Sequence, residues 1–424
     1  MNGQEMYSLV KELFPICRSI TGPGTRDTLN VLLRELPQMT IHNVPSGTQV
    51  FDWTVPKEWV IRDAYIETLT GKKIIDFNQS NLHVLGYSAS IDKVVSKEEL
   101  LKMVYTLPDQ PDLIPYVTSY YKERTGFCMS ENQKNSLSEK LYHVVVDSEF
   151  IDGNLTYGEL IIPGETKEEI FFSTYVCHPS MANNELSGPV VCTALAKYIQ
   201  SRKHRYTYRF VFIPETIGSI TYLSKNLEYL QQHVIAGFNI SCVGDDRTYS
   251  YIESPYADNL ADRVVQNVLS FHYPEYRRYA FMQRGSDERQ YCSPLVNLPM
   301  CAVCRSKYEE YPEYHTSADD LTVVSPDGLQ GAFDMLRKCI DMLEYNNKYR
   351  ITVPCEPQLG KRGLYPTISY KGSHDYVNIL TAFIAYSNGK HDLIDVSNRI
   401  KADIDTLKPI IDKCMLLDLI EIVK

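Results

Sequence analysis

The sequence predicts an α/β protein in which helices cover both faces of a mixed sheet. Three apolar segments, residues 170–176, 208–213 and 235–243, have the near-continuous hydrophobic composition of fully buried strands. Helical spacing of apolar residues follows the first two segments, at about residues 187–202 and 219–232. Alternation of buried strands with helices is typical of a sheet that is covered on both faces.

Further elements extend this pattern toward both ends of the chain. Apolar residues at three- and four-residue spacing predict a helix over residues 4–14, and a second helix follows the break at Gly22-Pro23-Gly24. The remaining predicted elements are a helix at about 257–270, a strand near 298–304 and a long helix near 326–344. They complete the α/β domain.

Composition divides the chain into three predicted domains. The α/β domain is discontinuous and occupies residues 1–49 and 136–353. Short strand-like pieces broken by Pro, Gly, Asp and Asn indicate a small, mainly β domain inserted at residues 50–135. Residues 354–424 have the order of three short helices and a strand, which suggests a winged helix. Asp152-Gly153-Asn154, between two expected strands, is a turn sequence suited to a hairpin.

The charge of the chain argues against nucleic acid as a partner. The 424 residues include 43 Lys and Arg against 53 Asp and Glu, a net charge of −10. Nucleic-acid binding depends on clustered positive charge that displaces counterions. The tail over residues 364–424 has 7 basic and 8 acidic residues, so we favour a docking or dimerisation role for it over DNA reading. A homo-oligomer is the expected assembly.

Several features predict a cytoplasmic protein. No apolar run approaches the roughly 18–20 residues that a membrane span needs, and the N-terminus lacks the basic and apolar segments of a signal peptide. The 11 cysteines lie in otherwise apolar segments, as buried thiols do in a reducing compartment. We therefore expect no membrane partner.

Residues with chemical potential follow the predicted strands. His178, Glu215 and Asp245 come directly after the three buried strands, and His315 lies farther along the chain. Ligands of an open α/β sheet bind at the carboxyl ends of its strands. Imidazole and carboxylate groups together suit zinc, which in catalytic sites has three protein ligands and an open position, and a further carboxylate can act as general base. Taken singly, each residue has a structural explanation, such as capping of the next helix by Glu215.

The order of these motifs resembles that of the M28 zinc aminopeptidases, the bacterial leucyl aminopeptidase type. More closely, the whole chain is similar to an uncharacterised bacterial group in which an M28-like domain carries a β-rich insert and a C-terminal winged helix, often in polysaccharide-biosynthesis settings. The resemblance implies a mixed-sheet, zinc-peptidase-like (phosphorylase/hydrolase-like) fold. The motifs that carry the broader resemblance are His178, 182–188 (Ala-Asn-Asn-Glu-Leu-Ser-Gly), 214–219, 244–246, 285–288 and 314–319, and those that carry the narrower one are 18–22 (Arg-Ser-Ile-Thr-Gly) and 51–59.

The resemblance implies that His178 and His315 are metal ligands and that Glu215 is the general base. Asn184 stands where the family has a bridging Asp, and Thr216 stands where it has a second Glu. Because both positions lose a carboxylate, the sequence argues against a two-zinc cluster and leaves one zinc ion or none.

Two further carboxylates are candidates to complete the ligand set. The family's later Asp ligand aligns near Ser241, and Asp245 is a displaced candidate for that role. Glu185, next to Asn184, is the other carboxylate that can substitute. The expected metal ligands are therefore His178, His315, Asn184 and Asp245.

Three residues are expected to bind substrate: Asp287, Tyr314 and Arg284. Asp287 would orient a ligand amine or a histidine, or else cap its own loop. Arg284 would contact an anionic group. The chain has 31 Tyr against 14 Phe, and the tyrosines in the insert and before His315 suit a polar cleft around a metal.

Two function hypotheses follow from these residues. The first is a metal-dependent, aminopeptidase-like hydrolase that uses metal-activated water to cleave an amide bond in a small peptide or in an amino-acid- or sugar-derived substrate. The alternative is a catalytically altered peptidase relative that binds a ligand or assembles partners, in polysaccharide biosynthesis. The combination of His178, Glu215 and His315 favours the first, and the absence of carboxylates at Asn184 and Thr216 favours the second.

Overall fold

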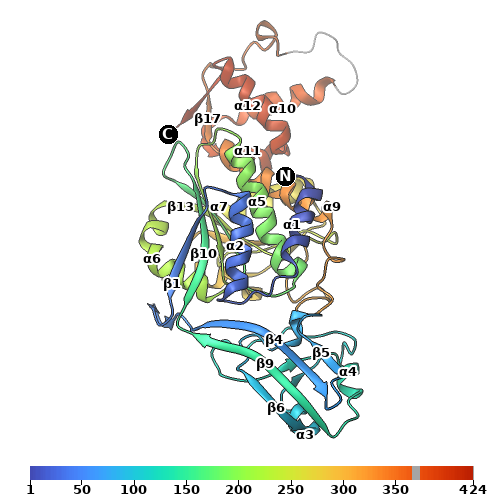
Figure 1. The fold of residues 1–424 in the computed structure, drawn as a ribbon. Coiled ribbons are helices and arrows are strands. Elements are labelled where there is room, and N and C mark those ends of the chain that lie inside the picture. Colours follow the sequence, from blue (N-terminus) through green and yellow to red (C-terminus); the bar gives the residue numbers. More distant parts are fainter. Residues whose placement is uncertain (365–372, 424) are drawn as a thin grey trace. The chain divides into compact units, whose positions relative to one another are not determined.

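The buried apolar strands form the centre of an eight-stranded mixed sheet, with the strand order β1-β10-β12-β11-β13-β16-β14-β15 (Figure 1). Its four central strands are parallel to one another, so their carboxyl ends lie at one edge of the sheet. This computed structural model of the chain describes residues 1–364 and 373–423. The strands are β1 (Thr40–Pro45), β10 (Asn154–Ile162), β11 (Glu169–Tyr175), β12 (Thr207–Ile213), β13 (Val234–Ile240), β14 (Ser250–Ile252), β15 (Arg277–Tyr279) and β16 (Met300–Cys304).

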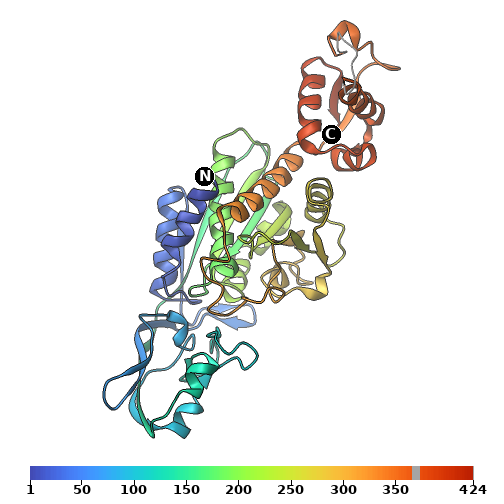
Figure 2. The same ribbon diagram turned by 90° about the vertical axis from the view of Figure 1, so that its right-hand side faces the viewer.

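Helices cover both faces of this sheet, as the sequence predicts. Every residue of β11 and β12 is buried. Neighbouring side chains of β11 point to opposite faces: Phe172 stacks on Phe210, whereas Phe171 packs against Tyr222. Figures 1 and 2 show α1, α2 and α5 grouped on one face. The helices of this part of the chain are α1 (Gly3–Leu13), α2 (Pro23–Glu35), α5 (Ser187–Gln200), α6 (Ile217–His233), α8 (Glu288–Tyr291) and the start of α9 (Pro326–Tyr345).

The insert is built on a four-stranded antiparallel sheet with the order β5-β4-β9-β6. Its third strand, β9 (Leu141–Ile151), lies beyond residue 135, where we place the end of the insert from composition. Long strands β4 and β9 pair in antiparallel fashion along most of their length, with one register shift between Ile61 and Asp63. The other elements here are β4 (Glu58–Thr68), β5 (Lys73–Asp76), β6 (Ile91–Ser96), α3 (Lys97–Leu101), α4 (Glu131–Asn135) and the short pairs β2 (Gln49–Val50) with β3 (Trp53–Thr54) and β7 (Val104–Tyr105) with β8 (Phe127–Cys128).

The prediction of a hairpin around residues 152–154 is wrong. The turn is present, but β9 pairs within the insert and β10 pairs within the large sheet, so the chain passes from one sheet to the other there. The backbone N–H of Asn154 donates to Glu58 (3.0 Å) and that of Gly153 donates to Ser46 (3.1 Å). These partners lie outside both strands, and they hold the turn in place of a two-strand ladder.

A second compact unit contains residues 257–276 and 334–424. Its winged helix has the three-stranded sheet β18-β17-β19 and three helices, in agreement with the sequence. Polar side chains of α12 are paired with the second half of α9, through Lys338 with Asp405 and Tyr345 with Asp412. The elements are α7 (Leu260–His272), β17 (Lys348–Ile351), α10 (Ser373–Tyr386), β18 (Asn388–Asp392), α11 (Leu393–Ile400), α12 (Ile404–Leu416) and β19 (Ile420–Val423).

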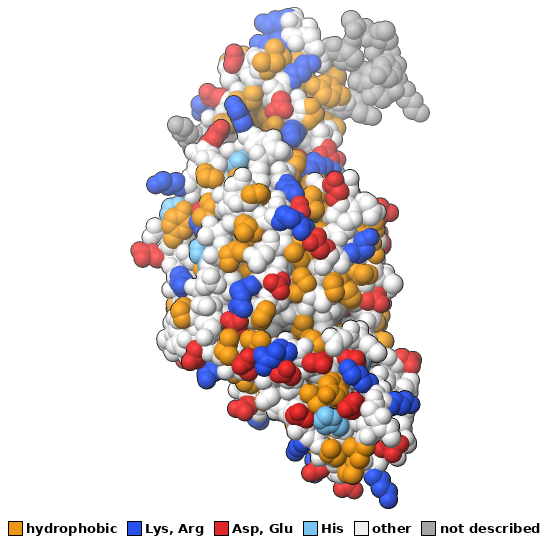
Figure 3. Space-filling view, in the orientation of Figure 1, with side chains coloured by type: hydrophobic (Ala, Val, Ile, Leu, Met, Phe, Trp, Pro, Cys, Tyr) orange, Lys and Arg blue, Asp and Glu red, His pale blue; other side chains and the backbone are white. Residues whose placement is uncertain are grey.

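On the face shown in Figure 3, Lys and Arg side chains are interspersed with Asp and Glu side chains. Within the described part of the chain, no helix combines the length and the apolar composition that crossing a membrane requires.

Gly188, in the first turn of α5, tests the packing of this helix on the sheet. A Cβ atom there would lie 2.3 Å from Oγ1 of Thr174 and 2.5 Å from the carbonyl oxygen of Ile240. We expect Gly188→Ala to lower the free energy of unfolding by about 1–3 kcal/mol, because the helix must move away from β11 and β13. Urea denaturation followed by circular dichroism measures this loss.

Gly360→Ala is the matched control. No atom lies within 4 Å of a Cβ atom built at Gly360, and its φ is not in the left-handed region. An unchanged midpoint in both variants would contradict the close contact of α5 with the sheet.

Candidate active site

His178, Glu215 and Asp245 follow three neighbouring strands at the same edge of the sheet. Cys177 and His178 come directly after β11, and Glu215 comes two residues after β12. A buried π-helical turn, Ala182–Leu186, follows His178 and leads into α5. Such turns are rare and often occur at functional sites. This edge of the sheet therefore carries His178, Glu215 and Asp245, which the sequence identifies as candidate functional residues.

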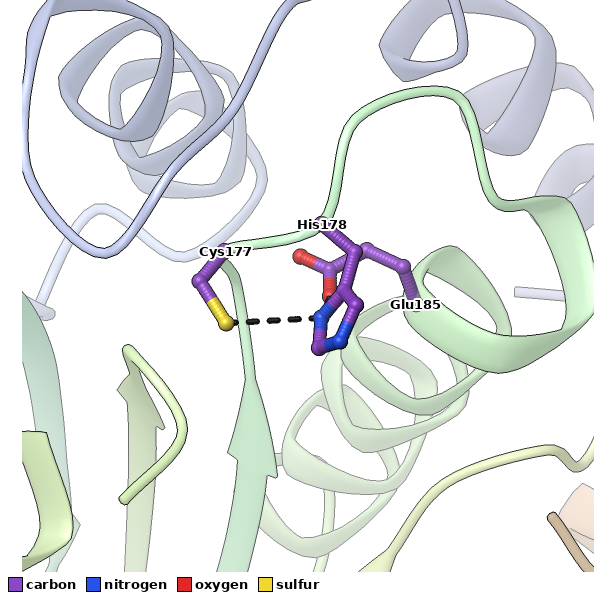
Figure 4. Close-up of side chains that lie close together, drawn as sticks. All are labelled: Cys177, His178 and Glu185. Atoms are coloured by element: carbon purple, nitrogen blue, oxygen red, sulfur yellow. Dashed lines mark hydrogen bonds and ion pairs between the residues drawn. The ribbon is translucent and has the colours of Figure 1, made fainter. Parts of the chain in front are cut away.

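Arg18 and Glu185 hold His178 in place, and Figure 4 shows the Glu185 carboxyl group beside the His178 ring. Glu185 contacts Nδ1 of His178 (3.0 Å), and Arg18 donates through Nε to the carbonyl oxygen of His178 (2.9 Å). Nε of Arg18 lies 3.6 Å from Oε1 of Glu185, and both side chains are fully buried. Burial raises the pKa of Glu185 to about 8, against the opposing charge of Arg18. Because Nδ1 is engaged, Nε2 is the nitrogen of His178 that faces the site.

His315 lies beside His178, with 5.3 Å between the ring centroids. Tyr314 stacks on His315 at 3.9 Å, and Tyr116 of the insert lies 5.0 Å from both imidazole rings. Burial lowers the pKa of each histidine to about 3, helped by Arg18 for His178 and by His178 for His315. Both rings are therefore neutral near pH 7, the form in which imidazole binds metal ions.

The insert contributes directly to this site. The backbone N–H of Tyr116 donates to the carbonyl oxygen of His315 (2.8 Å), and that of Ser317 donates to Ile114 (2.8 Å). Pro115 and Thr316 form an antiparallel bridge. Residues 114–116 thus fix the loop that carries His315 and cover both histidines with the ring of Tyr116.

Glu215 is a half-buried residue whose carboxyl group accepts a hydrogen bond from the side chain of Ser286 (2.6 Å). Burial, with the negative charge of Asp287 added, raises the pKa of Glu215 to about 8. The backbone N–H of Glu215 donates to Sγ of Cys177 (3.3 Å), the residue before His178, so the two strand ends lie side by side. Tyr175 and Tyr314 contact the two histidines.

Asp287 caps the start of α6. Its Oδ1 atom accepts from the backbone N–H of Thr216 (2.7 Å) and from the hydroxyl of Ser219 (2.8 Å). Burial raises the pKa of Asp287 to about 6. The carboxylate thus positions the segment that carries Glu215, a segment other than its own loop.

Strained backbone marks the same edge of the sheet. Four residues other than glycine have positive φ angles there, Ser180 (42°), Thr216 (64°), Cys242 (53°) and His315 (54°). Such conformations cost about 1–3 kcal/mol each and persist where surrounding contacts impose them. These strained residues lie near His178 and Glu215, as strained residues do at functional sites.

The remaining predicted residues have structural partners. Asp245 accepts from the side chain of Asn183 and from Ser306, so its carboxylate joins two loops. The guanidinium of Arg284 lies over the ring of Phe281, 4.5 Å from its centroid. Thus His178, His315 and Glu215 lie at the same edge of the sheet. Asp245 and Arg284 instead contact other residues, Asp245 through Asn183 and Ser306 and Arg284 through Phe281.

Asn184 lies within the buried site. Its side-chain amide donates to the hydroxyl of Tyr175 (2.8 Å), and its backbone N–H donates to Asp319 (3.0 Å). Asp319 also accepts from Asn183 and Tyr311, so it anchors the π-helical turn. Among the described residues, Oδ1 of Asn184 and Nε2 of His315 are buried without a hydrogen-bond partner.

These donors fit a single divalent metal ion. Two imidazoles that share a zinc ion through nitrogen at about 2.0–2.1 Å, in tetrahedral geometry, have ring centroids about 5 Å apart. The observed 5.3 Å matches this value. Nε2 of His178, Nε2 of His315 and Oδ1 of Asn184 would therefore hold the ion, with Glu215 as the nearby carboxylate.

A second cluster of potential ligands lies on the other side of His178. Ligand atoms of Cys177, His178 and Glu185 lie within 4.8 Å of one another. Burial raises the pKa values of Cys177 and Glu185, so both tend to keep their protons, and Arg18 places a positive charge beside them. A cation is therefore disfavoured at Nδ1 of His178.

Sequence reasoning missed three residues of the site. Tyr116 lies in an irregular part of the insert, and no sequence pattern indicates that it reaches the large sheet. Arg18 and Asp319 lie inside motifs of the family resemblance, so the motifs identify them but not their roles. A buried arginine and a buried aspartate are polar groups whose partners only the fold reveals.

The fold and the site define a zinc-aminopeptidase-like α/β protein with a C-terminal winged helix. A zinc aminopeptidase from Bacillus subtilis has a TM-score of 0.58 at 12% identity, over 80% of this chain and 94% of that one. An M28 peptidase precursor from Shewanella amazonensis has a TM-score of 0.56 at 12% identity, over 78% of this chain and 91% of that one. At this identity the likeness shows the fold.

The chain belongs to the family described as domain of unknown function DUF4910, whose model matches residues 7–346. A winged helix-turn-helix model matches residues 347–422. A Clostridium acetobutylicum protein, named for polysaccharide biosynthesis and an aminopeptidase-like domain, is 43% identical over 99% of this chain and 97% of its own length. A crystal structure of a candidate peptidase from the same organism has a TM-score of 0.93 at 42% identity, over 99% of this chain and 96% of that one.

Replacement of Arg18 tests the anchor of His178. We expect Arg18→Met to lower the free energy of unfolding by about 1–3 kcal/mol near neutral pH, because it leaves the buried carbonyl oxygens of Leu13 and His178 without the hydrogen bonds that Arg18 donates. The loss grows as the pH rises above about 8, because Glu185 then ionises in the wild type, where Arg18 stabilises the charge, whereas the variant has no such partner. Urea denaturation at several pH values measures both effects.

The double variant Arg18→Met/Glu185→Gln separates charge from packing, because it removes the titrating group and hence this pH dependence. Arg34→Met is the control for an exposed arginine that pairs with Glu12, and we expect it to change stability little. Equal effects of Arg18→Met and Arg34→Met would contradict the anchoring role.

Proposed function

We propose that the chain is an aminopeptidase-like hydrolase that cleaves an amide bond of a small substrate with the help of one divalent metal ion, zinc first among the candidates. The observation that carries the proposal is the pair of neutral imidazoles, 5.3 Å apart, at the sheet edge that also carries the half-buried Glu215. The zinc aminopeptidases that share the fold support the choice of metal. A bound zinc ion would polarise the amide carbonyl and acidify a water molecule.

Glu215 is the general base in this proposal. Its raised pKa matches the task, because a base whose pKa lies near the working pH accepts a proton efficiently and can return it to the leaving amine. Ser286 orients the carboxyl group, and Asp287 holds the backbone of Thr216. Tyr116 and Tyr314 restrict access of bulk water to the histidines.

The alternative function is a binding or assembly protein. It is supported by the neutral Asn184 and by the winged helix, whose α12 has Lys408 near Asp341 (3.6 Å) as well as the pairs with α9 described above. Because these α12 side chains are paired with α9, we propose that this unit has a docking role, including self-association. Binding of DNA at low salt would contradict this role.

The name of the Clostridium relative supports a polysaccharide-biosynthesis setting. A cytoplasmic location is proposed because the 11 cysteines lie in otherwise apolar segments, as buried thiols do in a reducing compartment.

Asn184→Asp tests the metal site by a gain of affinity. We expect the variant to bind zinc about tenfold more tightly or better, because a carboxylate replaces a neutral amide oxygen next to the two imidazoles. Competition with a chromogenic chelator measures the zinc affinity, and His315→Gln is expected to weaken it. Asn183→Asp is the matched control, since the side chain of Asn183 contacts Asp245 instead. Equal zinc affinity of Asn184→Asp and the wild type would contradict the assignment.

Glu215→Gln tests the catalytic proposal. We expect turnover of a panel of aminoacyl and N-acyl chromogenic amides to fall by about 10²–10⁴-fold, while zinc content stays the same. Glu310→Gln, at an exposed position, is the matched control. Wild-type protein that binds no zinc and cleaves none of the panel, with or without added metal, would refute the hydrolase and favour the binding protein.

A further inference from the structure

Two motifs of the sequence are not explained by the metal site, and they meet at a cleft. Residues 18–22 lead into α2, and residues 51–59 lead into β4. Thr21 accepts from the backbone N–H of Trp59 (3.1 Å). A Cβ atom at Gly22, whose φ is +109°, would lie 2.5 Å from the carbonyl oxygen of Trp59, so glycine is required at this crossing. The crossing forms one wall of a cleft with a volume of about 680 Å³.

The cleft carries carboxylates and neutral polar groups but no cation. None of the described residues that line it is Lys, Arg or His, whereas Asp27 and Asp320 both line it. Phosphate and carboxylate ligands are recognised mainly by cationic side chains. The cleft therefore disfavours an anionic ligand and suits one that is neutral or carries an amine.

The remaining lining suits a ligand with many hydroxyl groups. Asn78, Gln79 and Asn81 supply amides, and several serines supply hydroxyls. The apolar part includes Phe14 and Phe77, which can pack against the C–H faces of a sugar ring. Carboxylates and amides around an aromatic surface offer both the acceptors and the donors that a polyhydroxylated molecule requires.

The cleft borders the loops that carry both histidines. Ser180 and Ser317 line it, and each lies two residues after a histidine of the candidate site. A smaller void of about 10 Å³ is lined by the cleft residue Asn81 and by Arg18 and Tyr116 of the site. Arg18 and Tyr116, which line this void, both contact His178.

We propose that this cleft binds the sugar part of the substrate, so that the bond cleaved by the proposed hydrolase is the amide of an N-acylated sugar. Water would add to the acyl carbon and the C–N bond would break, which yields a carboxylate and a sugar amine that takes up the proton. The identity of the reaction rests on the proposed function, whereas sugar binding in the cleft does not.

Saturation-transfer NMR on the metal-free full-length protein tests the binding step. The probes are N-acetylglucosamine, its β-1,4-linked dimer and N-acetylglucosamine 6-phosphate, each at millimolar concentration. We expect transfer to the two neutral sugars and about tenfold weaker binding of the phosphate, because Asp27 and Asp320 repel it. Gln79→Lys places a cation at the cleft and should reverse this preference, whereas Gln4→Lys, on the exposed surface of α1, should leave it unchanged.

The outcomes separate this inference from the proposed function. Transfer to neither neutral sugar, equal binding of the phosphate, or an unchanged preference in Gln79→Lys would each overturn the sugar cleft. Sugar binding that Gln79→Lys alters, in a protein that binds no zinc and hydrolyses no amide, would support the cleft and refute the hydrolase. Release of acetate from N-acetylglucosamine that requires zinc and is lost in Glu215→Gln would support both.

Discussion

The buried contact between Arg18 and Glu185 is the interaction on which the candidate site depends. Arg18 lies outside the large sheet, yet its guanidinium reaches the backbone of His178 and a carboxyl group of the turn that follows. Removing Arg18 would leave the carbonyl oxygens of Leu13 and His178 without their buried donor, which is costly. The pair therefore couples the N-terminal segment to the end of β11 and fixes one nitrogen of His178.

The same constraint explains why the site is compact and aromatic. With Nδ1 of His178 engaged by Glu185, Nε2 is the nitrogen left to bind; the rings of Tyr116 and Tyr175 lie beside His178, and Tyr314 stacks on His315. The phenol groups let the site stay buried without losing hydrogen bonds, as the contact of Tyr175 with Asn184 shows. The excess of tyrosine in the sequence thus has a partial physical explanation.

Loss of family carboxylates changes the electrostatics of the site more than its shape. Asn184 and Thr216 keep the backbone contacts of their turns, through Asp319 and Asp287, but neither offers a charge to a metal ion. A site of neutral ligands supports one divalent ion better than two, because mutual repulsion of two ions needs a bridging anion. The proposed function is built on that difference from the aminopeptidases that share the fold.

The sequence by itself determined the α/β class, the order of the strands along the chain and the residues at their ends, including His178, Glu215 and His315. These features are local, since apolar runs and their helical spacing reflect burial that each segment carries in its own composition. Only the tertiary structure decided which of those residues meet. Asp245 follows a central strand as Glu215 does, yet contacts with Ser306 and Asn183 turn it into a loop anchor. Tyr116 reaches both histidines through pairing of an irregular segment with the His315 loop, a contact between distant residues that no local pattern encodes.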